Sequence, residues 1–195
     1  MKKILLLLSN GFEILEASAF IDVMGWNFEE GDKSTKLFTC GLKKHLKSSF
    51  DQQFTVDYLV KEIDVNNFDA LAIPGGFKNY CYYEDAYNEE FLNLIHDFGS
   101  KNKIIASICV GALPVAKSGI LTNKSGTTYN SEDYRKELAK YGVNLLDNPV
   151  VIDNNFITSN SPSTALDVAF VLLELLTNKE NTMKVRNLMG FSLAK

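Results

Sequence analysis

The residues with the clearest chemical potential are Ser107–Gly111, which read Ser-Ile-Cys-Val-Gly directly after the apolar run Lys103–Ala106. A buried strand that ends in small-x-Cys-x-Gly and leads into a helix is typical of a nucleophile elbow, in which the residues two before and two after the nucleophile are small. We expect the Cys109 sulfur to lie at a helix N-terminus, where partial positive charge and free N–H groups favour a thiolate. The alternative is a small buried hydrophobe, the commonest state of a free cysteine.

Glu16 is the carboxyl that we expect beside this sulfur. It shares a helical stripe with Ala19, Phe20 and Val23, at spacings of three, four and seven residues, so its side chain should point into the core. A buried carboxyl has a raised pKa and can donate a hydrogen bond to a thiolate. The alternative is a first-turn glutamate that only complements the helix dipole. Glu13, one turn earlier, is expected to be an exposed capping residue.

Gly75 and Gly76 follow Pro74 at the end of a short apolar run, Ala70–Ile73. Glycines at this point let the backbone approach a ligand and aim N–H groups at an oxyanion, although a tight turn is an equally simple reading. Because ligands of open α/β sheets bind beyond the carboxyl ends of the strands, we expect these glycines to lie near Cys109 and Glu16.

The number and positions of the histidines argue against several catalytic mechanisms. The chain has two histidines, His45 and His96, and both precede Cys109. A Cys-His peptidase or amidotransferase needs an imidazole within hydrogen-bond reach of the sulfur. Peptidase and amidotransferase activities are therefore not expected.

The other cysteines lack the context of an elbow. Cys40 ends a predicted strand and is expected in the core, whereas Cys81 lies in an aromatic run and is expected to be partly exposed. Three widely spaced cysteines without a C-x-x-C motif predict neither a disulfide framework nor a zinc site. We expect no metal and no organic cofactor.

The elements that must position these residues alternate between strands and helices. Strands are expected at Lys3–Leu8, Lys36–Cys40, Phe54–Val60, Ala70–Ile73 and Lys103–Ile108, with a hairpin at Val150–Asp153 and Phe156–Ser159. Helices are expected at about Leu15–Trp26, Asn88–Phe98, Val110–Lys117, Ser131–Lys140, Ser161–Leu176 and Asn181–Leu188, with Ser131 as an N-cap, Pro162 at N1 and Gly119 after a C-terminus. This alternation predicts an α/β domain over residues 1–195, a doubly wound, mostly parallel sheet with helices on both faces.

Composition limits the partners. The chain has 195 residues, 46% of them hydrophobic, and a formal net charge of −4. That balance argues against nucleic acid and anionic membranes, and no segment approaches the ~20 apolar residues of a membrane span. The apolar run after Lys2-Lys3 is too short for a signal peptide, so we expect a cytoplasmic protein.

These motifs together resemble the DJ-1/PfpI (ThiJ) superfamily. The resemblance extends over essentially the whole chain and is carried by Gly11–Glu16 with Asp22–Met24, by Leu71–Gly76, by Ala106–Gly111, and by Ile157–Ser159 with Pro162. It implies a flavodoxin-like sandwich, a homodimer, and an oxidisable Cys109 hydrogen-bonded to a protonated Glu16. It also implies that the backbone of Gly76 and Val110 lines the sulfur pocket.

The departures from the family pattern concern the activity. Val110 stands where the PfpI-type peptidase branch has histidine and where the isonitrile hydratase-like branch has threonine. Tyr129 stands where the glyoxalase/deglycase-like branch has histidine, and Phe50 falls near a basic position of that branch, which argues against glyoxalase or deglycase activity. Tyr129 is either a hydrogen-bond donor near the sulfur or a packing aromatic.

Two classes of function follow. The first is a protein with a reactive Cys109, acting in redox or electrophile response or in carbonyl or hydrolytic chemistry on a small molecule. The second is a non-catalytic dimeric binding or chaperone-like module that keeps the elbow as architecture, with Tyr80, Tyr82, Tyr83 and Tyr87 as a ligand rim or dimer surface.

Overall fold

The computed structural model describes residues 1–191. Its strands are β1 (Lys2–Leu8), β2 (Thr35–Gly41), β3 (His45–Lys47), β4 (Gln53–Thr55), β5 (Tyr58–Leu59), β6 (Ala70–Ile73), β7 (Ile104–Ser107), β8 (Ser125–Gly126), β9 (Asn144–Leu145), β10 (Val150–Asp153) and β11 (Phe156–Ser159). Its α-helices are α1 (Ile14–Glu30), α2 (Tyr82–Ala86), α3 (Glu89–Ser100), α4 (Ala112–Lys117), α5 (Glu132–Lys140), α6 (Ala165–Leu176) and α7 (Lys179–Leu188).

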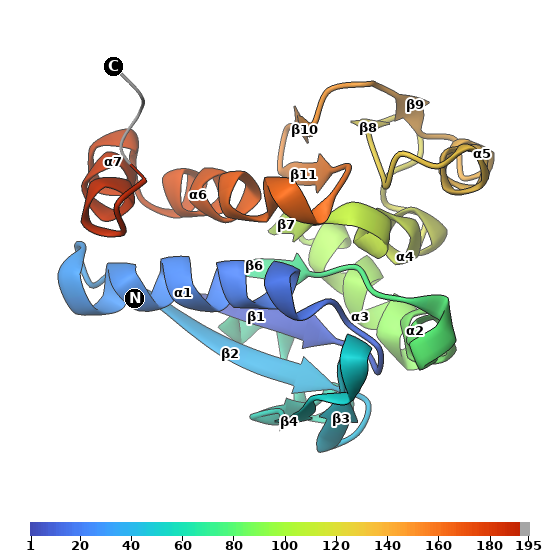
Figure 1. Ribbon diagram of the computed structural model, residues 1–195, viewed down its shortest axis with the longest axis horizontal. Coiled ribbons are helices and arrows are strands. Elements are labelled where there is room, and N and C mark those ends of the chain that lie inside the picture. The colour runs from blue at the N-terminus through green and yellow to red at the C-terminus, as the bar shows by residue number, and fades with distance from the viewer. Residues whose placement is uncertain (192–195) are drawn as a thin grey trace.

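The central sheet has seven strands in the order β10-β11-β7-β6-β1-β2-β5. Every neighbouring pair in it is parallel except β10 with β11, which form the predicted hairpin. Figure 1 shows α1 and α6 packed side by side in front of this sheet, with α3 behind it. The predicted α/β fold with a mostly parallel sheet between two helical layers is confirmed. None of the helices within residues 1–191 is long and apolar enough to cross a membrane.

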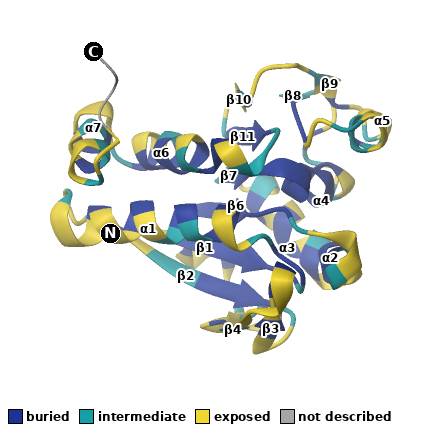
Figure 2. Cartoon of the chain, in the orientation of Figure 1, coloured by how far each residue is buried: buried dark blue, intermediate teal, exposed yellow. Residues whose placement is uncertain are grey.

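Strand β1 explains where the core lies. Its residues Ile4–Leu8 are all fully buried, and it pairs with β2 on one side and β6 on the other. A central parallel strand covered by helices on both faces is apolar at every position rather than at alternate ones. The burial map in Figure 2 shows the central strands buried and the helices exposed along their outer sides.

Helix α1 carries the predicted buried stripe. Glu16, Ala19, Phe20 and Val23 are at most 3% exposed, and the helix packs against α6 and α7. The helix is longer than the sequence pattern indicated, because it continues through Trp26 to Glu30. The stripe fixes the side of α1 that faces the sheet, and with it the direction of the Glu16 carboxyl.

The strand predicted at Phe54–Val60 is wrong. That segment is split into β4, which pairs with β3 in a separate hairpin, and β5, which pairs with β2 in the main sheet. Asp57 lies between them, and its Oδ2 accepts hydrogen bonds of 2.8 Å from both the N–H and the hydroxyl of Thr39. The N–H of Asp57 also donates to the Thr39 carbonyl (3.1 Å), so backbone and side chain together attach Asp57 to β2 at the point where the chain changes sheets.

Several helix starts also differ from the prediction. Pro162 lies at the start as predicted, but Pro162–Thr164 form a 3₁₀ turn and α6 begins only at Ala165, while α7 begins at Lys179 rather than Asn181. The helix after Cys109 begins as a 3₁₀ turn over Cys109–Gly111 and continues as the six-residue α4, with Gly119 at φ +91° beyond its end as predicted. Ser131 precedes α5, but its side chain makes no capping hydrogen bond. Ser131 instead lines a pocket between α5 and the segment that carries α2.

Candidate active site

The candidate site lies at the carboxyl ends of β1, β6 and β7, which are adjacent in the sheet. The segments that follow these strands carry Glu16, the pair Gly75-Gly76, and Cys109. Parallel strands bring their carboxyl ends to one edge of the sheet, so residues far apart in the chain meet there. The structure brings together the three segments that the sequence singled out.

The elbow has the backbone geometry that its spacing predicted. Cys109 adopts φ +57°, in the left-handed region that non-glycine residues seldom occupy. Gly111 is required by packing, because a Cβ there would lie 2.7 Å from the Ile73 carbonyl oxygen. Ser107, two residues before the cysteine, is fully buried. The turn is therefore tight on both sides of the sulfur.

Glu16 is fully buried, and its two carboxyl oxygens differ in their contacts. Oε2 accepts a hydrogen bond of 2.5 Å from the N–H of Gly75. Oε1 has no hydrogen-bond partner among residues 1–191. Burial raises the pKa of Glu16 to about 8, against the opposing effects of the Gly75 N–H and the Cys109 thiol. At neutral pH the carboxyl is mostly protonated and has a proton to donate.

Cys109 is 8% exposed, and its electrostatic surroundings act in both directions. Burial raises the pKa of the Cys109 thiol, and a negatively charged Glu16 raises it further, whereas the N–H of Val110 lowers it. The help expected from a helix N-terminus is weak, because α4 is short and begins with a 3₁₀ turn. The influence of Glu16 depends on its proton, since a protonated carboxyl carries no charge and can donate to the sulfur.

A pocket of about 240 Å³ opens onto Cys109 and Glu16. Its other lining residues are Glu13, Gly76, Phe77, Lys78, Val110, Tyr129, Tyr134 and Pro162. This volume suits a small molecule of a few heavy atoms rather than a peptide. Val110 and Gly76, whose backbone was predicted to line the sulfur pocket, both lie in its wall.

The two glycines play different parts. The N–H of Gly75 is engaged with Glu16, and Gly75 does not line the pocket, so the expected use of this N–H for an oxyanion is wrong. Gly76 lies opposite Phe12 in an isolated antiparallel β-bridge. The two hydrogen bonds of this bridge run from the N–H of Phe77 to the Gly11 carbonyl and from the N–H of Glu13 to the Gly75 carbonyl, so the Gly76 N–H takes no part in them. A Cβ on Gly76 would lie 2.2 Å from the Gly11 carbonyl oxygen, so only glycine fits.

Tyr129 lies in the wall of the pocket and is 42% exposed. Its ring packs edge-on against that of Tyr134, with centroids 6.2 Å apart. Within the described residues its hydroxyl makes no hydrogen bond, whereas the neighbouring Thr128 hydroxyl donates one of 3.0 Å to the Cys109 carbonyl. The geometry gives Tyr129 the contacts of a wall residue.

Neither histidine lines the pocket. His45 contacts Thr55 in the β3–β4 hairpin, and His96 on α3 contacts the carbonyl of Ser118. Cys40 is buried and Cys81 is exposed, as expected, and all three cysteines are free. Among residues 1–191, no group of three or more His, Cys, Asp or Glu side chains is placed to hold a metal ion.

Some pocket residues were missed from the sequence. Glu13 was expected to be an exposed cap, but it is half-buried, makes no capping hydrogen bond, and accepts one of 3.3 Å from the Ser49 hydroxyl. Lys78 lies just after the Gly-Gly turn, and Tyr134 comes from α5. The position of Lys78 two residues after Gly76 was a usable signal, whereas nothing local marked Tyr134.

Comparison with known proteins places the chain in a family. The model of the DJ-1/PfpI family matches residues 2–175. Protein dj-1beta of Drosophila melanogaster is 30% identical over 188 residues, with 94% of each chain covered. The crystal structure of that Drosophila protein superimposes with a TM-score of 0.85 at 27% identity, and it covers 98% of this chain and 99% of that one.

Other relatives match over shorter stretches. A protein named deglycase PfpI, from Pyrococcus furiosus, is 30% identical over 107 residues, which are 55% of this chain and 61% of the relative. An uncharacterised protein of Methanocaldococcus jannaschii is 32% identical over 113 residues. This chain spans only about half of that relative, 54% of its length.

Proposed function

Since the chain belongs to the DJ-1/PfpI family, we propose that it is a reactive-cysteine protein whose Cys109 sulfur attacks a small electrophile, either a carbonyl compound or a peroxide. The observation that carries the proposal is the buried carboxyl of Glu16, held by Gly75 on one oxygen and unpartnered on the other, beside an elbow cysteine in a left-handed conformation. Strained backbone and buried titratable groups gather at functional sites more often than elsewhere.

The two groups share their protons. Burial disfavours charge on both, so at neutral pH the pair carries at most one negative charge. That charge lies either on Glu16, with Cys109 as a neutral thiol, or on the sulfur, with Glu16 protonated. The second form is the nucleophile, and it is stabilised by two donors, the carboxyl O–H of Glu16 and the N–H of Val110.

With a carbonyl compound, the thiolate forms a C–S bond to the carbonyl carbon. The π electrons of the C=O group move to the oxygen, which takes the proton of Glu16 and gives a thiohemiacetal. With hydrogen peroxide, an S–O bond forms as the O–O bond breaks. The sulfur is oxidised to a sulfenic acid, while the departing hydroxide takes the proton of Glu16 and leaves as water. Glu16 acts as the acid in both reactions.

The remaining wall residues orient the small molecule. The N–H of Val110 is assigned to the sulfur, so we assign the N–H of Gly76, which donates no hydrogen bond among residues 1–191, to the oxygen of the small molecule, in place of the Gly75 N–H that Glu16 occupies. We assign Tyr129 as an aromatic wall. Peptidase chemistry is not proposed, because no imidazole lines the described pocket.

One observation favours the second function class, a non-catalytic binding module. The thiol is nearly covered by protein, and its burial favours the neutral form. In that case Cys109 would react no faster than an ordinary buried cysteine, and the elbow would have only a structural role.

We further propose a homodimer in a reducing compartment, the cytoplasm. The three free cysteines support that compartment. Trp26 on α1 is 41% exposed, and a Cβ on the neighbouring Gly25 would meet no atom within 4 Å. A helix-interior glycine costs about 1 kcal/mol relative to alanine, so a glycine that its own chain does not need is explained by close approach of another chain.

Mild peroxide oxidation followed by peptide mass spectrometry tests the reactive-cysteine proposal. The three cysteines serve as internal controls, because Cys81 is exposed and Cys40 is buried in the core. We expect sulfenic or sulfinic acid on Cys109 before Cys81, although Cys81 is the more accessible. Oxidation that follows exposure, with Cys81 first, would favour the binding module.

A further inference from the structure

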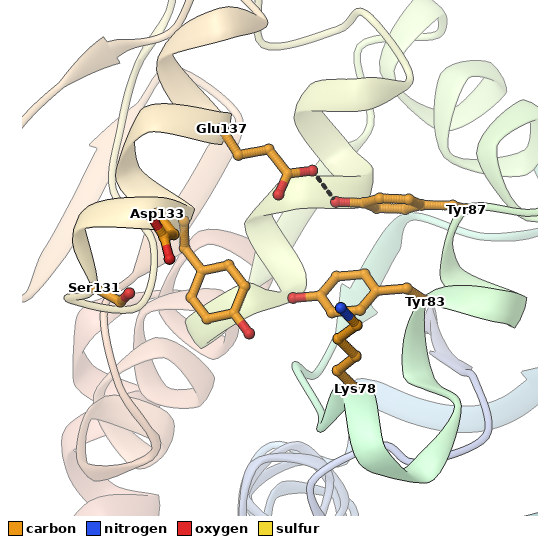
Figure 3. Close-up of a pocket in the computed structure, with 7 residues that line it drawn as sticks. Lys78, Tyr83, Tyr87, Ser131, Asp133 and Glu137 are labelled. Carbon is orange, nitrogen blue, oxygen red and sulfur yellow. Dashed lines mark hydrogen bonds between the residues drawn. The ribbon is translucent and has the colours of Figure 1, made fainter.

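A second pocket adjoins the Cys109 pocket and has about twice its volume, about 490 Å³. It lies between the segment that carries α2 and the first two turns of α5, and it is lined by Lys78, Tyr83, Tyr87, Ser131, Asp133, Tyr134 and Glu137. Lys78 and Tyr134 line both pockets. Figure 3 shows Tyr87 pointing to Glu137, to which it donates a hydrogen bond, and Tyr83 pointing from the same side toward α5.

Polar groups in this pocket are left without partners. The buried hydroxyl of Tyr83 has no hydrogen-bond partner among residues 1–191. A buried polar group without a hydrogen-bond partner costs free energy, so each such group needs an explanation. Ser131, which does not cap α5, adds a second hydroxyl. The Tyr83 hydroxyl is covered by protein beside the pocket, so the hydroxyl that the pocket presents is that of Ser131.

The charges of the pocket are also unpaired. Lys78, Asp133 and Glu137 form no salt bridge within the described part of the chain. Glu137 accepts hydrogen bonds from Tyr87 (2.5 Å) and from Tyr141 (3.5 Å), and both go to Oε1. Its Oε2 is left for another donor. The pocket thus combines one free cation with two carboxylates that lie one turn apart on α5.

These groups fit a ligand with two opposite charges. A ligand with only a negative charge would meet Asp133 and Glu137, and one with only a positive charge would meet Lys78. We propose that the second pocket is a binding site for a small zwitterion of the α-amino acid class. Lys78 binds its carboxylate, Glu137 and Asp133 bind its ammonium group, and the tyrosine rings cover its apolar part.

This site goes beyond the proposed function, because it needs no reaction at Cys109. The test is isothermal titration calorimetry of the wild-type protein with L-phenylalanine and two matched analogues, 3-phenylpropanoate, which lacks the ammonium group, and phenethylamine, which lacks the carboxylate. None of the three is an electrophile. We expect L-phenylalanine to bind at least 10-fold more tightly than either analogue.

Two variants assign the charges. Lys78→Gln should weaken binding of L-phenylalanine and 3-phenylpropanoate at least 5-fold and leave phenethylamine unchanged. Glu137→Gln should do the reverse, weakening L-phenylalanine and phenethylamine but not 3-phenylpropanoate. Lys61→Gln, at an exposed lysine outside both pockets, should change none of them.

Lys78→Gln also separates binding from folding. Lys78 is exposed and forms no salt bridge within the described residues, so its substitution should weaken L-phenylalanine binding without lowering the midpoint of thermal unfolding. The proposal is overturned if L-phenylalanine binds no more tightly than its analogues, or if its affinity is unchanged by both Lys78→Gln and Glu137→Gln. Either result leaves the chemistry proposed for Cys109 untouched.

Discussion

The N–H of Gly75 donates a hydrogen bond of 2.5 Å to Oε2 of Glu16, and this bond ties the turn after β6 to the first turn of α1. The carboxyl is thereby fixed with its other oxygen, Oε1, unpartnered beside the Cys109 pocket. A Cβ on Gly75 would lie 3.0 Å from the Val110 nitrogen and 3.1 Å from Glu16 Oε2. A side chain at this position would crowd both the carboxyl and the elbow.

The buried Glu16 predicts a pH dependence of stability. Its pKa is raised from 4.5 to about 8 in the folded protein, so between these values the folded state holds more protons than the unfolded one. Stability is then highest below pH 4.5 with respect to this group, and it falls as the pH rises toward 8, with a slope of up to about 1.4 kcal/mol per pH unit. Urea unfolding at pH 5, 6, 7 and 8 measures the slope.

Glu16→Gln is the matched control, because the amide keeps the shape of the side chain and does not titrate. The unfolding free energy of wild type minus that of the variant should decrease as the pH rises from 5 to 8. A difference that is constant between pH 5 and 8 would show that the Glu16 carboxyl keeps an ordinary pKa.

Gly111→Ala tests the packing of the elbow. The added Cβ would lie 2.7 Å from the Ile73 carbonyl oxygen, which belongs to a strand and cannot move freely. We expect a loss of about 1–3 kcal/mol in the free energy of unfolding, the usual cost of overpacking. A loss below about 0.5 kcal/mol would contradict the tight elbow.

The sequence predicted the fold well where burial alone determines structure. β1, β6 and β7 are short apolar runs buried on both faces, and their positions were found to within a residue. The segment Phe54–Val60 was misread because the hydrogen bonds of Asp57 to Thr39 link residues 18 apart in sequence. A contact between segments this far apart in the chain leaves no periodic signal in the local sequence.

The site residues also fall into those that local sequence patterns predicted and those whose positions depend on packing between distant segments. Cys109 and Glu16 were found because an elbow and a helix stripe are local patterns. Lys78 and Tyr134 were missed because their places in the pocket depend on how the turn after β6 and the helix α5 pack around it. The use of the Gly75 N–H by Glu16 likewise depends on contact between segments 59 residues apart.

Tyr129→Phe tests the part played by the tyrosine in the pocket wall. Because we assign Tyr129 as an aromatic surface, removing its hydroxyl should leave the alkylation rate of Cys109 within about two-fold of wild type, which is less than 1 kcal/mol. Stopped-flow alkylation at fixed pH gives the rate. A drop of ten-fold or more would instead make the Tyr129 hydroxyl a donor to the reacting group.

Gly25→Arg tests the proposed dimer. Within one protomer the new side chain has open space on α1, so the fold should persist, as judged by circular dichroism. A large charged side chain at a close helix contact would separate the subunits, and sedimentation velocity should then show a monomer where wild type is a dimer. If wild type and variant sediment alike, Gly25 lies outside any subunit contact.

The central claim is that Glu16 and Cys109 share their protons, and the pH dependence of Cys109 alkylation, followed by peptide mass spectrometry in wild type and Glu16→Gln, tests it most directly. In wild type we predict that the rate rises with the first proton lost by the pair, at or below about pH 8. In Glu16→Gln the inflection should move up by at least one pH unit, because an amide is a weaker donor and cannot accept the proton of the thiol. The same inflection in both proteins would contradict the claim.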